Sequence, residues 1–188
     1  MALIEVVIDG TNFGGKTPLV ARLVERMRER GRRVETASPY REREVYPLWD
    51  DDPIGAARIL HEVMAQHRAR AAGADVLVWD RGWPTCYIAT ANPAAREFFE
   101  PRPRLTFLLL NTGETTERKV RKYGISETAY PWMHRRRLRD EISYRELAAR
   151  FAADVRCFTP THDDSRFDLE LVSGEIVEAV ERERAMGA

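Results

Sequence analysis

The chain has 188 residues, of which 30 are Lys or Arg and 30 are Asp or Glu, so its formal net charge at neutral pH is zero. This length suffices for one domain with its own core, and the balanced charge provides no overall field that would recruit nucleic acid or an acidic membrane surface. Cys86 and Cys157 lie outside any redox or zinc-binding spacing, and no apolar run is long enough for a signal peptide or a membrane span. We therefore expect a single cytoplasmic domain, residues 1–188, that binds neither nucleic acid nor membrane.

The first expected elements are a strand and a helix. Residues 3–8 form an apolar run interrupted by one glutamate, typical of a parallel strand covered on both faces, and the run ends directly in Asp9-Gly10. In residues 17–30, apolar side chains recur at helical spacing with charges between them, and Gly31 is placed to end the helix. The start of the chain is thus expected to be a buried strand followed by an amphipathic helix.

The rest of the sequence continues to alternate between strands and helices. Expected strands cover residues 34–37, 74–80, 105–110 and 155–159, and expected helices cover 54–72, 114–122, 138–153 and 173–184. Residues 167–172 carry no clear pattern. This alternation predicts an α/β fold with a doubly wound, parallel five-stranded sheet and helices on both faces.

A phosphate-binding motif follows the first strand. Residues 10–17 read Gly-Thr-Asn-Phe-Gly-Gly-Lys-Thr and match the pattern G-x-x-x-x-G-K-[ST] at every fixed position. Glycines allow backbone amides to point inward, and the following helix N-terminus adds positive potential. We expect this P-loop to bind ATP, with Lys16 bridging the β- and γ-phosphates and the Thr17 hydroxyl binding Mg²⁺. The expected nucleotide-binding residues are Gly10, Asn12, Phe13, Gly14, Gly15, Lys16, Thr17 and Pro18.

A second metal ligand is expected at the end of the third strand. Asp80 follows four apolar residues, which is the layout of a Walker B carboxylate. It would lie near the Mg²⁺ held by Thr17 and bind it directly or through water. A carboxylate that caps the next helix is the alternative interpretation.

Together these residues resemble the nucleoside monophosphate kinases, most closely the thymidylate kinase group and its deoxynucleoside kinase relatives. Residues 8–17 stand where that family has Phe-Glu-Gly-x-Asp-Gly-x-Gly-Lys-[ST], Asp80-Arg81 stand where it has Asp-Arg-Tyr, and residues 108–122 resemble the strand and arginine-bearing helix before its lid. The likeness covers most of the chain. It implies a P-loop fold of the nucleotide kinase type with ATP and Mg²⁺ as cofactors, and the family's frequent homodimers leave a homodimer open here.

The resemblance also implies residues that bind the acceptor. Arg81 would hold the acceptor's phosphate with its guanidinium fork. Asp9, at the family's Glu position, would order magnesium-bound water or the acceptor. Arg41 and Arg43, after the second strand, are further candidates for the phosphate, and Trp83 is a candidate for the pocket around the base.

Two departures from the family concern the identity of the acceptor. Asn12 replaces the family's P-loop Asp, so a sugar contact made by that carboxylate does not carry over. The segment that faces the base in the family reads Thr-Cys-Tyr-Ile-Ala-Thr in residues 85–90, so thymine recognition does not carry over either. These changes favour a modified nucleotide of a specialised pathway.

A cation-rich segment, about residues 121–140, stands where the family has its mobile lid. Closure of such a lid brings arginines onto the phosphates, stabilises the transition state and excludes water. From this segment we expect Arg121, Arg135 and Arg139 to be catalytic, together with Lys16, Asp9 and Arg81.

The leading hypothesis is therefore transfer of the γ-phosphoryl group of ATP to a nucleoside monophosphate. A kinase for the hydroxyl of a nucleoside or small metabolite is the alternative; it needs a carboxylate near the attacking oxygen, a role that Asp9 could fill. A non-catalytic nucleotide-binding module also stays open. No lysine stands in the [NT]-K-x-D pattern of a guanine-specific switch, which argues against GTPase signalling.

Overall fold

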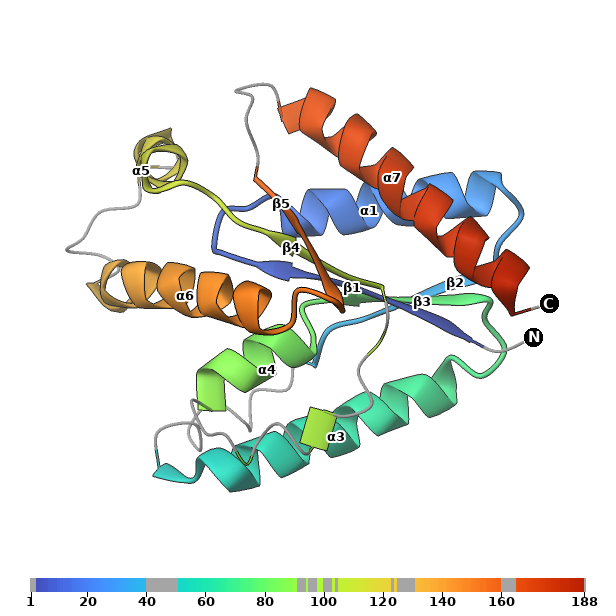
Figure 1. The fold of residues 1–188 in the computed structure, drawn as a ribbon, viewed down its shortest axis with the longest axis horizontal. Helices are drawn as coiled ribbons and strands as arrows, with labels where there is room; N and C mark the ends of the chain where they lie inside the picture. Colours follow the sequence, from blue (N-terminus) through green and yellow to red (C-terminus); the bar gives the residue numbers. More distant parts are fainter. Residues whose placement is uncertain are drawn as a thin grey trace.

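The computed structural model describes residues 3–39, 51–90, 94, 98–99, 103, 105–122, 124, 131–159 and 165–187, and for a few of these, including 131–139, the backbone alone. Its centre is a parallel sheet with the strand order β2-β3-β1-β4-β5 (Figure 1). The strands are β1 (Ile4–Gly10), β2 (Val34–Ala37), β3 (Val76–Asp80), β4 (Leu105–Leu109) and β5 (Val155–Phe158). The expected parallel five-stranded sheet is confirmed.

The strand order brings three strand ends together. β1 lies between β3 and β4, with Ile8 opposite Asp80 and Gly10 opposite Leu109. The chain builds β2 and β3 on one side of β1 and then crosses to the other side for β4 and β5. In open α/β sheets, ligands bind outside the carboxyl ends of the strands at such a reversal. The carboxyl edge beside β1 is therefore where a site is expected.

Helices cover both faces of the sheet (Figure 1). On one face lie α1 (Lys16–Glu29) and α7 (Ser165–Met186); on the other lie α3 (Pro53–Arg70), α4 (Trp83–Thr90) and α6 (Pro131–Arg150), while α5 (Gly113–Lys122) follows β4. Val6 and Ile8 pack in the core beneath α1 and α7, and Val7 packs in the core on the opposite face. All three are fully buried, which explains the continuous apolar run of β1.

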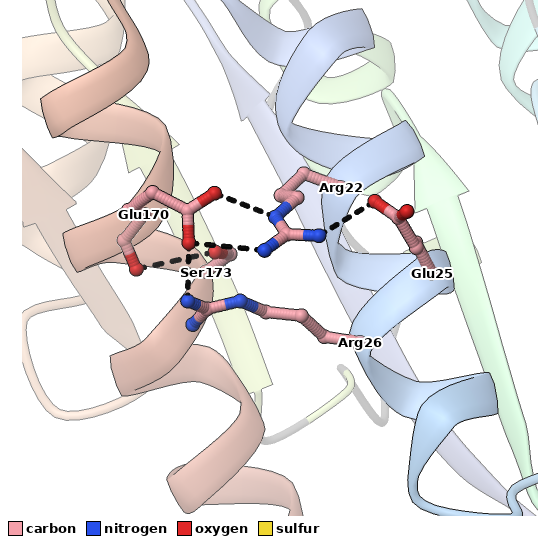
Figure 2. Close-up of polar contacts among 5 residues, drawn as sticks. All are labelled: Arg22, Glu25, Arg26, Glu170 and Ser173. Atoms are coloured by element: carbon pink, nitrogen blue, oxygen red, sulfur yellow. Dashed lines mark hydrogen bonds and ion pairs between the residues drawn. The ribbon is translucent and has the colours of Figure 1, made fainter.

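Charged side chains join α1 to α7 (Figure 2). The Arg22 guanidinium donates to the two carboxylate oxygens of Glu170 over 2.7 and 3.1 Å and to Glu25 of its own helix, and Arg26 also donates to Glu170. The Ser173 hydroxyl donates to the Glu170 carbonyl over 3.3 Å. These contacts hold the first turns of α7, which begins at Ser165 although the sequence indicated a start near residue 173.

Two further helices differ from the expectation. α4 was not predicted, because its sequence has little polar–apolar alternation and its first turn is stabilised by a side chain from β1. α6 begins at Pro131 instead of near residue 138, because its arginine-rich start carries no apolar stripe. The expected lid segment, about residues 121–140, therefore contains the end of α5 and the first half of α6; residues 123 and 125–130 lie outside the described residues.

Two compositional expectations can be compared with the structure. Both cysteines are free thiols, Cys86 buried and Cys157 exposed, so no disulfide joins them. In the part of the chain that the structure describes, no helix combines the length and apolar character needed to cross a membrane.

Candidate active site

Gly10 ends β1 and starts the P-loop with a backbone conformation that requires glycine. Its φ is +125°, and a Cβ at this position would lie 2.2 Å from the carbonyl oxygen of Leu109 in β4. Gly15, directly before α1, also has a positive φ, +82°. Two of the motif's glycines are thus needed for the path of the backbone, one for contact with β4 and one for entry into the helix.

Hydrogen bonds of Thr11 and Asn12 fix the loop to the end of β4. The Thr11 amide and hydroxyl donate to the Leu109 carbonyl over 3.0 and 3.2 Å. Asn111, fully buried, donates its amide to the Thr11 hydroxyl over 2.9 Å and its side-chain NH₂ to the Asn12 carbonyl over 3.0 Å. The side-chain oxygen of Asn111 has no hydrogen-bond partner within the described residues. These bonds make β4 a rigid support for the loop.

Lys16 lies folded against this loop. Its ammonium group donates to the carbonyl of Gly10 over 3.0 Å and to the carbonyl of Thr11 over 2.6 Å, and the residue is only 7% exposed. A buried ammonium beside a helix N-terminus concentrates positive charge at the carboxyl edge of the sheet. The arrangement suits an anion with several oxygens, such as a polyphosphate.

Thr17 and Asp80 meet beside the loop. The Thr17 hydroxyl, in the first turn of α1, donates to the carboxylate of Asp80 over 3.1 Å. The parallel register of β1 and β3 brings Asp80 to this edge, opposite Ile8. The amides of Gly82, directly before α4, and of Thr85, in its first turn, donate to Asp9, which makes Asp9 the carboxylate that caps this helix.

A hydroxyl and a carboxylate at this distance are chemically suited to Mg²⁺. Mg²⁺ prefers oxygen ligands and is usually bound by one or two protein groups together with phosphate and water oxygens. No group of three or more His, Cys, Asp or Glu side chains that could hold a metal occurs in the described part of the chain. Thr17 and Asp80 would therefore hold the ion jointly with a bound nucleotide, and the donor set fits that role.

Asp9 is fully buried and accepts five hydrogen bonds. Its Oδ1 accepts from the Gly10 amide over 2.8 Å, the Thr85 hydroxyl over 2.5 Å and the Tyr144 hydroxyl over 2.8 Å. Its Oδ2 accepts from the amides of Gly82 and Thr85, both over 3.0 Å. Two carboxylate oxygens offer about four lone-pair sites, so this carboxylate has no acceptor capacity left.

Tyr144 of α6 and Thr85 of α4 complete this buried cluster. Their hydroxyl oxygens lie 2.6 Å apart, and Tyr144 is 3% exposed. Burial, followed by the negative charge of Asp9, raises the pKa of Tyr144 well above its ordinary value. Tyr144 therefore remains a protonated donor throughout the neutral pH range.

Arg81 occupies the turn between β3 and α4. Its φ is +68°, its amide donates to the Ile8 carbonyl over 2.9 Å, and the residue is half-buried. The guanidinium donates to the side-chain oxygen of Asn12 over 2.9 Å and contacts the Thr85 hydroxyl at 3.5 Å. Arg81 thus lies directly beside the P-loop.

Trp83 occupies a different place from the one expected. It is 1% exposed, donates its indole N–H to the Thr106 hydroxyl over 3.1 Å and packs edge-on against Phe151 at 5.4 Å between ring centroids. It also lines a cavity of about 270 Å³ beside α3, together with Glu5 and other residues, but neither Lys16 nor Arg81 lines this cavity. These contacts give Trp83 a packing role in the core.

The other expected residues are less closely joined to the loop or are not described. Arg121, on α5, is exposed and lies 3.9 Å from the carboxylate of Glu117 on the same helix. Arg135 and Arg139 are in the first half of α6, where only the backbone is described. Arg41 and Arg43 lie outside the described residues. Phe13, Gly14 and Pro18 stand in the loop and the first turn of α1.

Sequence reasoning missed the supporting residues of the site: Thr11, Thr85, Asn111 and Tyr144. Asn111 carried a weak signal, because a polar residue directly follows the buried run of β4. Tyr144 carried none, since its contact with Asp9 spans 135 positions of the chain.

Comparison with solved structures identifies the fold. Thymidylate kinase from Ehrlichia chaffeensis is similar, with 13% identity, a TM-score of 0.62, and coverage of 96% of this chain and 100% of that chain. Two structures of deoxyadenosine kinase from M. mycoides, with dCMP and dCDP or with dCTP bound, have 14% identity, TM-scores of 0.57 and 0.52, and coverage of 93% of this chain and 100% of theirs. No protein family model and no curated protein matches the sequence. The chain therefore has the nucleotide kinase type of P-loop α/β fold.

Proposed function

We propose that this protein is an ATP- and Mg²⁺-dependent nucleotide kinase that transfers the γ-phosphoryl group of ATP to a nucleoside monophosphate. The observation that carries the proposal is the meeting of three features at the carboxyl edge of the sheet: the P-loop with Lys16, the pair of Thr17 and Asp80, and Arg81 beside Asn12. They would supply a cradle for a polyphosphate, oxygen ligands for a cation, and a second cation for another phosphate.

On the ATP side, the loop amides and Lys16 would bind the β- and γ-phosphates. Lys16 is buried, so its charge is less screened by water than that of a surface lysine. During transfer, the Lys16 ammonium can move with the negative charge of the γ-phosphoryl group and stay out of bulk water. Mg²⁺, when held by Thr17 and Asp80, would neutralise charge on the phosphates.

On the acceptor side, Arg81 would hold the phosphate of the monophosphate. Its guanidinium donates to the side-chain oxygen of Asn12 over 2.9 Å and contacts the Thr85 hydroxyl at 3.5 Å. A guanidinium fork beside the P-loop is suited to bidentate binding of a phosphate. Held there, a phosphate oxygen would attack in line, and positioning would supply much of the rate acceleration.

The type of acceptor follows from the state of Asp9. A hydroxyl acceptor needs a general base, whereas a phosphate oxygen is already nucleophilic. Asp9 and Asp80 lie beside the loop; Asp9 accepts five hydrogen bonds, and Asp80 accepts the Thr17 hydroxyl. This arrangement favours a monophosphate over a nucleoside as the acceptor. Residues 121–140, with their arginines, remain the proposed lid.

The test is ADP release from MgATP against a panel of nucleoside monophosphates, nucleosides, and no acceptor. We expect turnover with at least one monophosphate and a decrease in kcat/KM of at least about a hundredfold in Lys16→Ala. Arg70→Ala is the matched control, because Arg70 is an exposed cation at the far end of α3. Turnover with nucleosides alone would identify a hydroxyl kinase instead, and nucleotide binding without turnover on any acceptor would indicate a non-catalytic module.

A further inference from the structure

Asp9 joins three elements that are far apart in the sequence. It is the second-to-last residue of β1, caps α4 through the amides of Gly82 and Thr85, and accepts the Tyr144 hydroxyl of α6. Each of these contacts is buried or half-buried, where a hydrogen bond to a charged group is stronger than at the surface. The position of α4 relative to β1 and α6 therefore depends on this one carboxylate and its donors.

The same carboxylate holds the turn that carries Arg81. The residue after Arg81 donates its amide to Oδ2 of Asp9, and the Arg81 amide donates to the carbonyl of Ile8, the residue before Asp9. Arg81 has a φ of +68°, a conformation that persists only where the surroundings hold it. The Thr85 hydroxyl, which donates to Asp9, also lies 3.5 Å from the Arg81 guanidinium.

The P-loop has further support from β4. Thr11 and Asn12 are bonded to Leu109 and Asn111 at the end of β4, on the opposite side of β1 from Arg81. None of these four bonds involves Asp9, Thr85 or Tyr144. The P-loop is also joined to the Asp9 cluster, by the Gly10 amide, which donates to Oδ1, and by Asn12, which accepts from Arg81. Because its four bonds to the end of β4 do not depend on Tyr144 or Thr85, loss of either hydroxyl should affect the acceptor more than ATP.

We propose that Tyr144 and Thr85 are positioning residues that act through Asp9 to hold Arg81 in its orientation toward the acceptor's phosphate. The inference rests on the proposed function, since it assumes that Arg81 binds an acceptor. It also gives α6 a role in the acceptor site, because the Tyr144 hydroxyl of this helix donates directly to Asp9. The first half of α6 lies in the proposed lid segment. Loss of the Tyr144 hydroxyl leaves Asp9 with one donor fewer and loosens the Arg81 turn, while the P-loop keeps its contacts.

The first measurement is steady-state kinetics of Tyr144→Phe and Thr85→Val with each substrate varied in turn. We expect the KM for the acceptor to rise roughly tenfold, as for loss of one hydrogen bond to a charged group, while the KM for ATP stays within about twofold. Thr85→Ser keeps the hydroxyl and should behave as the unmodified protein. In the double variant, the KM for the acceptor should rise by less than the product of the two single rises, because both hydroxyls donate to the same oxygen of Asp9.

Tyr87→Phe is the matched control. The Tyr87 hydroxyl also links α4 to α6, by accepting a hydrogen bond from Arg150 over 3.0 Å, but it does not touch Asp9. If any loss of contact between these helices raised the KM for the acceptor, Tyr87→Phe would do so as well. We expect it to leave both KM values unchanged.

Hydrogen exchange gives a readout that does not depend on turnover. The amides of Gly82 and Thr85 should exchange faster in Tyr144→Phe, whereas the amides of Thr11 and Asn111 should not change. If the unmodified protein turns over no acceptor, the proposed function fails. Hydrogen exchange then still shows whether the Tyr144 hydroxyl stabilises the turn that carries Arg81. Equal changes in both KM values, no change in either, or unchanged exchange at Gly82 and Thr85 would overturn the inference.

Discussion

The hydroxyl of Thr17 donates to the carboxylate of Asp80 over 3.1 Å, although 63 positions separate the two residues in the chain. The contact joins the first turn of α1 to the end of β3 and lies at the surface, next to the P-loop. A neutral hydroxyl and a carboxylate gain little stability from an exposed hydrogen bond. Both oxygens are of the kind that Mg²⁺ prefers, and in the proposed function they bind the ion together.

Replacement of either oxygen should therefore weaken the response to Mg²⁺. Asp80→Asn and Thr17→Val should each raise the Mg²⁺ concentration needed for half-maximal ADP release by at least about tenfold, because each removes one ligand. Thr17→Ser retains the hydroxyl and should respond as the unmodified protein does. Binding of ATP measured with and without Mg²⁺ checks this independently of turnover. An unchanged Mg²⁺ dependence in Asp80→Asn would show that this pair does not hold the ion.

Gly10→Ala should destabilise the protein and disrupt the phosphate site together. The new Cβ would lie 2.2 Å from the Leu109 carbonyl oxygen, at a φ of +125° that L-residues rarely adopt. We expect the free energy of unfolding to fall by more than about 2 kcal/mol, measured by urea denaturation. Gly73→Ala is the control: a Cβ there meets nothing within 4 Å, so the change should stay within about 0.5 kcal/mol. Similar losses in both variants would contradict this explanation.

The sequence predicted those parts of the site that depend on local order. The P-loop residues are neighbours in the chain, and Asp80 is marked by the end of an apolar strand, so both were predicted without tertiary information. The bonds from Tyr144 to Asp9 and from Asn111 to Asn12 depend on which elements lie side by side, which local pattern does not encode. The burial of Trp83 has the same basis: its position beside Asp80-Arg81 in the sequence does not indicate that its indole N–H bonds to Thr106 in the core.

The ion pairs between α1 and α7 should stabilise the protein in a way that depends on salt and pH (Figure 2). The hydrogen bond from Arg22, opposed in part by desolvation and supported by the charges of Arg22 and Arg26, lowers the pKa of Glu170 below its ordinary value of 4.5. A carboxylate with a lowered pKa stabilises the fold above its ordinary pKa, and this contribution is lost as the pH falls through the lowered value.

Glu170→Gln should therefore lower the midpoint of thermal unfolding at pH 7 in low salt. The difference from the unmodified protein should shrink in high salt, because surface charges are screened, and also as the pH falls below 4.5. Glu178→Gln is the control, since within the described part of the chain Glu178 pairs with Arg182 of its own helix, at 3.8 Å, and not with a second helix. A difference that persists at high salt would mean that Glu170 acts through packing and not through charge.

Tyr144 should make the stability of the protein decrease at alkaline pH. Its pKa is raised above the ordinary value of 10.0 by burial and by the charge of Asp9, so in the folded state the hydroxyl keeps its proton after the unfolded chain has lost it. Stability from this group is complete below pH 10 and is lost as the pH rises from there toward the higher folded pKa. At pH 8, Tyr144→Phe should be less stable by about 2 kcal/mol, because a hydrogen bond to a carboxylate is removed. Urea denaturation between pH 8 and 11 should show that the difference in free energy of unfolding between the two proteins narrows above pH 10. A difference that stays constant over this range would mean that the Tyr144 hydroxyl does not cause the loss of stability at alkaline pH.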